Sequence, residues 1–266
     1  MSPIIPIDLE IKSENITILV YGYTGSGKTH FAGTARNSIF LDFEGGTATL
    51  LNVDFKGKAF HLDTASDLRQ VLSWFNSSEQ LNQLTDKVGF KPESVVIDTL
   101  TRMQQHTQLD ILDHREIKAG KQEDVMEQKE WGRLLIQMYR LMKILPNQGF
   151  DIIALAQARE FEDPASKIIK WMPNLTGQWG DQIGAYVDIV SFLELVQTVD
   201  GRVVHRLHLQ PSGGWSAKSR YKNLPKYLDD ANYSDLKRIV LEARKGGESV
   251  KSSQSIETKI ETKSVE

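Results

Sequence analysis

The chain contains 266 residues, with 32 basic and 35 acidic side chains, a net charge of −3 and 40% hydrophobic residues. This size and composition support one substantial hydrophobic core, and the near-neutral charge excludes a uniformly basic nucleic-acid-binding protein while permitting a local basic groove. The absence of cysteine excludes disulfides, thiolate zinc sites and cysteine nucleophiles. Because there is neither a long apolar stretch nor a secretory signal pattern, we expect a cytoplasmic protein that does not enter a membrane.

Four short apolar runs, rich in β-branched residues, predict buried strands. They cover residues 16–20, 38–42, 94–98 and 151–156. Longer segments compatible with helices separate them, and residues 131–145 place apolar side chains at helical spacing. The alternation predicts an α/β fold with a mostly parallel sheet flanked by helices.

The pattern changes after the fourth predicted strand. Residues 187–196 and 203–209 resemble two strands joined by a tight Asp-Gly turn, so we expect a C-terminal antiparallel hairpin. Residues 245–266 lack aromatic side chains and contain few hydrophobic ones, which predicts a disordered tail. The expected organisation is therefore an N-terminal extension over residues 1–15, one α/β domain over 16–244, and the tail.

A phosphate-binding pattern follows the first predicted strand. Residues 22–29 match G-x-x-x-x-G-K-[ST], and a predicted helix comes next. Glycines in such a loop let backbone N–H groups converge on phosphate oxygens, while Lys28 would reach the β- and γ-phosphates and Thr29 would bind Mg²⁺. The predicted nucleotide site comprises Gly22, Tyr23, Thr24, Gly25, Ser26, Gly27, Lys28, Thr29 and His30.

Acidic residues end two of the other predicted strands. Asp98 lies where a P-loop enzyme needs a carboxylate for the Mg²⁺ shell, although a strand-terminal aspartate can also cap the next helix. Glu44 lies in a loop with two glycines, which favours it as the base that orients water. Asp42 still lies within its strand, where it would act as a buried structural acceptor.

Together these motifs resemble those of RecA-like ATPases, most closely the phage nucleotide-binding proteins that include RecA-like single-strand annealing proteins. The resemblance rests on GYTGSGKT, LDFEGG, SVVIDT, IIALAQ and a later AKSR, and covers roughly residues 15–230. It implies that Glu44 activates the attacking water, that Asp98 is the Mg²⁺-shell acid, and that Gln157 senses the γ-phosphate. It also implies that Lys218 and Arg220 reach the nucleotide of a neighbouring subunit.

The resemblance further implies a Mg-ATP-dependent ATPase that forms a homo-oligomeric ring or filament with sites at its subunit interfaces. Such a protein binds single-stranded DNA and promotes annealing or recombination in a bacterial host or phage-infected cell, with a single-strand-binding protein as a candidate partner. The DNA-contacting segments would be residues 102–129 and 159–180. In the second segment, Trp171 would stack on a base, and Lys167 and Lys170 would contact phosphates.

Two other functions remain open from the sequence. A phosphotransferase acting on a small molecule would need arginines near the phosphate loop, and only Arg36 and the distant Arg159 are suggestive. An ATP-switched assembly or partner-remodelling protein would work without DNA, and the balanced charges of residues 159–180 also suit a partner loop. The histidines have no metal-binding spacing, and His205 and His208 are three residues apart on a predicted strand, so we expect no histidine metal site.

Overall fold

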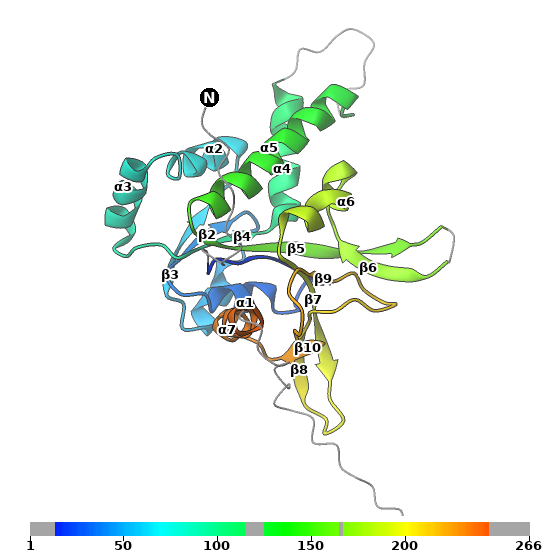
Figure 1. The fold of residues 1–266 in the computed structure, drawn as a ribbon. Helices are drawn as coiled ribbons and strands as arrows, with labels where there is room; N and C mark the ends of the chain where they lie inside the picture. The colour runs from blue at the N-terminus through cyan, green and yellow to red at the C-terminus, as the bar shows by residue number, and fades with distance from the viewer. Residues whose placement is uncertain (1–13, 115–124, 165–166, 245–266) are drawn as a thin grey trace, which may run out of the picture.

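The computed structural model describes residues 14–114, 125–164 and 167–244, and its centre is a twisted β-sheet (Figure 1). Among these residues the sheet contains ten strands, with the order β10-β8-β7-β1-β5-β4-β2-β3, while β6 pairs with β5 and β9 pairs with β7. The parallel part consists of β1 (Thr17–Gly22), β2 (Ser38–Asp42), β3 (Gly57–His61), β4 (Ser94–Asp98), β5 (Asp151–Glu162) and β7 (Ile189–Gln197).

Helices cover both faces of the sheet (Figure 1). Residues Leu19 and Tyr21 of β1 belong to one core cluster, whereas Ile18 and Val20 belong to another, as the alternation of side chains along a strand requires. The first cluster is completed by α2 (Ala65–Ser73), α3 (Ser78–Val88), α4 (Leu100–Asp113), α5 (Gln128–Asn147) and α6 (Gly177–Tyr186). The second is completed by α1 (Lys28–Gly33), the 3-10 helix η1 (Thr47–Asn52) and α7 (Tyr233–Arg244). Both faces of β1 are therefore buried.

The predicted α/β fold is confirmed. All four apolar runs form parallel strands of one sheet, and the periodic segment 131–145 lies within α5. The predicted C-terminal hairpin is formed by β7 and β8 (Val203–His208), which pair in antiparallel orientation. Two further short strands, β9 (Lys218–Ser219) and β10 (Tyr227–Asp229), join this side of the sheet.

The fourth predicted strand is longer than the sequence suggested. We expected it to end at Ala156 with a loop over 159–180, but β5 continues to Glu162 and pairs with β6 (Ile169–Pro173). The resulting β5–β6 hairpin extends away from the body of the protein (Figure 1). Apart from Pro173, its described residues are exposed or half-buried, and they lack the apolar run that marked the buried strands.

Several expectations fall partly or wholly outside the described residues. These are the N-terminal extension, of which residues 1–13 are not described, the tail over 245–266, and residues 115–124 of the first predicted DNA segment. Within the described part of the chain, no helix is both long and apolar enough to cross a bilayer.

Candidate active site

The phosphate loop connects the end of β1 to the start of α1. Gly25 and Gly27 have φ angles of +82° and +93°, in the left-handed region that favours glycine. At Gly27 a side chain would also lack space, since its Cβ would lie 2.5 Å from Nδ1 of His205. Ser26 is buried, while Thr24 and His30 are exposed on either side of the loop. The loop shape therefore depends on the two glycines predicted to form it.

Lys28 lies inside the phosphate loop. Its Nζ donates hydrogen bonds to the carbonyl oxygens of Gly22, at 3.0 Å, and Tyr23, at 2.7 Å. Burial lowers the pKa of Lys28, and the nearby carboxylates of Asp98 and Glu44 oppose that shift. The ammonium group is thus held by carbonyl oxygens that phosphate oxygens could replace.

Thr29, in α1 after β1, meets Asp98, at the end of β4, although β1 and β4 are not neighbours. The Thr29 hydroxyl donates to Oδ2 of Asp98 at 2.8 Å, and β5 lies between β1 and β4 in the sheet. Among the described residues no group of three or more His, Cys, Asp or Glu side chains could hold a metal by itself. One hydroxyl and one carboxylate nevertheless fit Mg²⁺, because this ion binds few protein oxygens and completes its shell with phosphates and waters. The two residues therefore fit the predicted metal role.

Asp98 has an unusual protonation equilibrium. Burial raises its pKa from 3.8 to about 6, the Thr29 hydrogen bond counteracts part of this shift, and the carboxylates of Glu44 and Asp42 add to it. Below about pH 4 the carboxyl group is protonated in both the folded and the unfolded chain, so its burial does not lower the free energy of unfolding. Between about pH 4 and pH 6 the unfolded chain ionises while the folded protein stays protonated, so stability falls over this range, and above pH 6 the buried charge costs about 3 kcal/mol.

We therefore expect Asp98→Asn, without Mg²⁺ or nucleotide, to raise the Tm at pH 8 and to leave it nearly unchanged at pH 4. The amide retains an oxygen that accepts the Thr29 hydrogen bond but carries no charge. Thermal unfolding at both pH values measures the effect, and Asp86→Asn, at an exposed aspartate, is the control. An equal change in Tm at both pH values would contradict the raised pKa.

Glu44 is exposed and is held at one oxygen. Its Oε1 accepts hydrogen bonds from the Thr99 hydroxyl, at 2.8 Å, and from Nε2 of Gln157, at 2.9 Å. Gln157 pairs with Gly22 in the register of β5 and β1, which places it beside the phosphate loop. The structure thus brings Glu44 and Gln157 together at the carboxyl edge of the sheet, and Thr99 acts as a support for Glu44.

Asp42 shapes the loop that carries Glu44. It is 1% exposed, and its Oδ1 accepts from the backbone N–H groups of Glu44, Gly45 and Gly46, at 3.0, 2.8 and 3.4 Å. Its other oxygen lies 3.4 Å from Nδ1 of His61. The interpretation of Asp42 as a buried structural acceptor agrees with these contacts.

The two cations predicted to act on a neighbour lie elsewhere. Lys218 donates to the carbonyl oxygen of Gly184, and Arg220 donates to that of Ala185 and forms an ion pair with Asp188 at 3.2 Å. Strand β9, which contains Lys218 and precedes Arg220, pairs with the start of β7, whereas the phosphate loop lies beside Leu193 in the middle of β7. Within one chain, Lys218 and Arg220 therefore hold the end of α6, and a role in another subunit's site stays a prediction.

Sequence reasoning missed one residue at the phosphate loop. His205 comes from β8, and its Nδ1 lies 2.9 Å from the carbonyl oxygen of Ser26. The sequence gives no signal of this contact, because about 180 residues separate the two positions and β8 reaches the loop only through the sheet order. This contact with a backbone carbonyl does not test the expectation that His205 belongs to no metal site.

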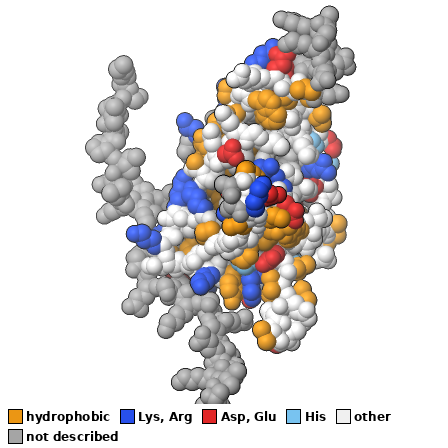
Figure 2. Space-filling model, turned by 90° about the vertical axis from the view of Figure 1, so that its right-hand side faces the viewer, with side chains coloured by type: hydrophobic (Ala, Val, Ile, Leu, Met, Phe, Trp, Pro, Cys, Tyr) orange, Lys and Arg blue, Asp and Glu red, His pale blue; other side chains and the backbone are white. Residues whose placement is uncertain are grey.

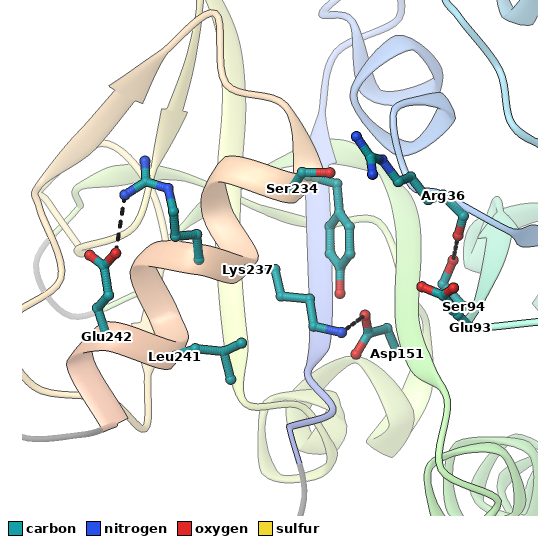
Figure 3. A pocket seen from close by; sticks show the side chains of 10 residues that line it. Arg36, Glu93, Ser94, Asp151, Ser234, Lys237, Leu241 and Glu242 are labelled. Carbon is teal, nitrogen blue, oxygen red and sulfur yellow. Dashed lines mark hydrogen bonds and ion pairs between the residues drawn. The ribbon is translucent and has the colours of Figure 1, made fainter.

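A pocket of about 420 Å³ lies at the edge of the sheet opposite the phosphate loop (Figure 3). Ser94 and Asp151, the first residues of β4 and β5, line it, and Lys237 donates to Asp151 at 2.7 Å. Arg36 also lines this pocket, and its carbonyl oxygen accepts from the Ser94 hydroxyl. Arg36 is therefore at the edge away from the phosphate loop, which removes one of the two arginines that suggested a phosphotransferase.

The chain was also compared with protein families, curated sequences and solved structures. Residues 14–221 match the AAA domain family. A similar solved structure is a KaiC-like protein from the hyperthermophilic archaeon Pyrococcus horikoshii OT3, with 15% identity, a TM-score of 0.42, and coverage of 73% of this chain and 78% of that chain. No curated protein sequence matches. Since the family match covers more than half of the chain and includes the phosphate loop, the chain belongs to the AAA domain family of P-loop ATPases.

Proposed function

We propose that this chain is a Mg-ATP-dependent ATPase that binds single-stranded DNA and promotes annealing or recombination, like the phage nucleotide-binding proteins that its motifs resemble. One observation carries the ATPase part. The exposed carboxylate of Glu44 is fixed by Thr99 and Gln157 at the same sheet edge as the phosphate loop and the Thr29–Asp98 pair. This is the arrangement needed to orient a water molecule toward a bound γ-phosphate.

Each side chain has a defined task in this proposal. Lys28 exchanges the carbonyl oxygens of Gly22 and Tyr23 for phosphate oxygens. Thr29 and Asp98 would hold Mg²⁺, which supplies charge neutralisation at the phosphates. Glu44 accepts the proton of the attacking water, and Gln157 connects Glu44 to β5.

The DNA part of the proposal is supported by the β5–β6 hairpin. It continues directly from Gln157 and carries exposed apolar residues, with Phe161 37%, Ile168 47% and Ile169 56% exposed. Lys167 is also exposed and forms an ion pair with Glu162 at 3.2 Å. Figure 2 shows the side of the protein toward which the hairpin extends, where hydrophobic, basic and acidic side chains are interspersed. This mixture suits base stacking more than a purely electrostatic contact.

Trp171 is less suited to stacking on DNA than we expected from the sequence. Its ring is half-buried and packs edge-on against Tyr23, with centroids 4.3 Å apart. Its backbone N–H donates to the carbonyl oxygen of Gly214, and its carbonyl accepts from Ser216. These contacts anchor the hairpin to the body, so Phe161 is the better candidate for a stacking residue.

We expect single-stranded DNA to stimulate ATP turnover, and Phe161→Ala to weaken DNA binding by roughly 5- to 150-fold, the loss of one stacked base. Turnover without DNA should remain unchanged, since Phe161 lies beyond the nucleotide site. A DNA titration monitored by turnover and by fluorescence anisotropy measures both effects, and Val203→Ala, an exposed apolar position on the β7–β8 hairpin, is the control.

A parent protein that hydrolyses ATP but neither binds nor responds to single-stranded DNA would contradict the DNA part alone. The exposed apolar residues of the β5–β6 hairpin would then favour the partner-remodelling function. Transfer of phosphate to an acceptor other than water would instead identify a phosphotransferase.

We further propose that the protein assembles as a homo-oligomer in which Lys218 and Arg220 act on a neighbouring site, as an arginine finger does. We expect the Lys218→Ala/Arg220→Ala variant to lose turnover by at least about 10³-fold. Mixing it with Lys28→Ala should restore part of the turnover, because each variant supplies what the other lacks. Lys222→Ala, at an exposed lysine nearby, is the control. If the mixed proteins are folded and co-assemble but remain inactive, the pair serves only to hold α6.

A further inference from the structure

We propose that His30 and His205 form the subsite that binds the base of the nucleotide. This inference rests on the proposed function, because it requires that the phosphate loop binds ATP. Neither histidine has a role in the proposed hydrolysis, because the side chains assigned to that step come from strands on the other side of β1. The ligand of this subsite is a flat aromatic base. Three features support its binding there: the order of the strands, the geometry of the two rings and the contacts that hold His205.

The strand order fixes the direction of a bound nucleotide. Gln157 on β5, Asp98 on β4 and Glu44 after β2 all lie on one side of β1. These side chains serve the γ-phosphate, so the rest of the nucleotide must extend toward the other side of β1. Strands β7 and β8 are found there, and β8 carries His205.

The rings of His30 and His205 lie near one another with matching orientation. Their planes differ by 8° and their centroids are 6.3 Å apart. His30 immediately follows Thr29 and is exposed, while His205 is half-buried. Because the two rings are nearly parallel and His30 is exposed, a planar base can stack against them.

His205 is held firmly in place. Its Nδ1 donates to the carbonyl oxygen of Ser26, since a carbonyl can only accept, and its backbone N–H donates to Oδ1 of Asp230 at 2.9 Å. The carbonyl oxygen of His205 accepts from the backbone N–H of Asp230 at 2.8 Å. Gly27 leaves the space that the ring occupies. A ring that is fixed before binding loses little entropy when a ligand stacks on it.

The experiment compares ATP with inorganic triphosphate, which has the phosphates but no base. We expect His205→Ala and His30→Ala each to weaken ATP binding by roughly 5- to 150-fold in calorimetric titrations with Mg²⁺. Triphosphate binding should change by less than about twofold, since the phosphate loop remains intact. We also expect ATP and GTP to bind with similar affinity, because stacking is available to every base.

Two substitutions by phenylalanine test the role of the rings. His30→Phe and His205→Phe keep an aromatic face, so we expect both to retain most of the ATP affinity. His114→Ala, at an exposed histidine on the far end of α4, is the control and should change neither titration. The His30 variants keep the test valid if loss of the Ser26 contact unfolds the His205 variants.

Equal weakening of ATP and triphosphate by His205→Ala and His30→Ala would overturn the proposal, because the histidines would then support the phosphate loop instead of the base. Unchanged ATP affinity in both alanine variants would overturn it as well. Failure of the proposed function gives a different result, since Lys28→Ala would then bind ATP and triphosphate as tightly as the parent protein.

Discussion

We expect Lys28→Ala to lose ATP turnover by about 10²–10³-fold and to bind nucleotide more weakly. Lys28 is 8% exposed, and its ammonium lies within the phosphate loop on the carbonyl oxygens of Gly22 and Tyr23. Alanine leaves no cation there to meet the β- and γ-phosphates. Turnover assays and calorimetric titration of ATP measure the two quantities.

Lys58→Ala is the matched control, because Lys58 is an exposed lysine on the edge strand β3. Burial penalises the charge of Lys28, so its removal should not unfold the protein, and thermal unfolding verifies this point. A folded Lys28→Ala protein with the turnover and ATP affinity of the parent would disprove the assignment of the phosphate loop.

The second large effect concerns Glu44→Gln, which should bind Mg-ATP like the parent but hydrolyse it about 10²–10⁴-fold more slowly. Glutamine has nearly the same volume, and its amide oxygen can still accept from Thr99 and Gln157. It cannot take a proton from water. The result is a loss of kcat with little change in nucleotide affinity.

Glu79→Gln, at an exposed glutamate in the first turn of α3, is the control for the loss of one negative charge. Turnover of Glu44→Gln within a few-fold of the parent would make Glu44 a structural residue. Asp42 and Asp98 would then be the acids to reconsider, and Asp42 is already occupied by three backbone N–H groups.

The parallel sheet and much of the site could be predicted from the sequence, because both depend on short-range patterns. Each buried parallel strand is a continuous apolar run, as 94–98 shows, and polar residues at the ends of such strands must meet at one edge. That rule alone brings Asp98, Glu44 and Gln157 together. The contacts among them, such as the bond from Thr99 to Glu44, depend on side-chain geometry that no spacing specifies.

The elements that the sequence did not reveal are exposed or depend on distant partners. Strand β3 is only partly buried, and the outer half of β5 is exposed, so neither has the hydrophobic signature of a core strand. His205 gains its role from the position of β8 two strands away from β1. Trp171 looked like a surface aromatic within a polar segment, yet its pairing partners place it against Tyr23.

Strand β5 connects the β5–β6 hairpin directly to the candidate active site. Up to Ala154 this strand pairs in parallel with both β1 and β4, up to Gln157 it pairs with β1 alone, and from Ala158 onward it pairs with β6. The part beyond β1 runs five residues to Glu162, a length of about 17 Å at the usual rise of a strand, and its partner strand is held on the body at Trp171. Gln157 is the last residue paired with β1 and donates to Glu44, so we expect a ligand bound to the exposed part of the hairpin to shift Gln157 and with it the position of the Glu44 carboxylate.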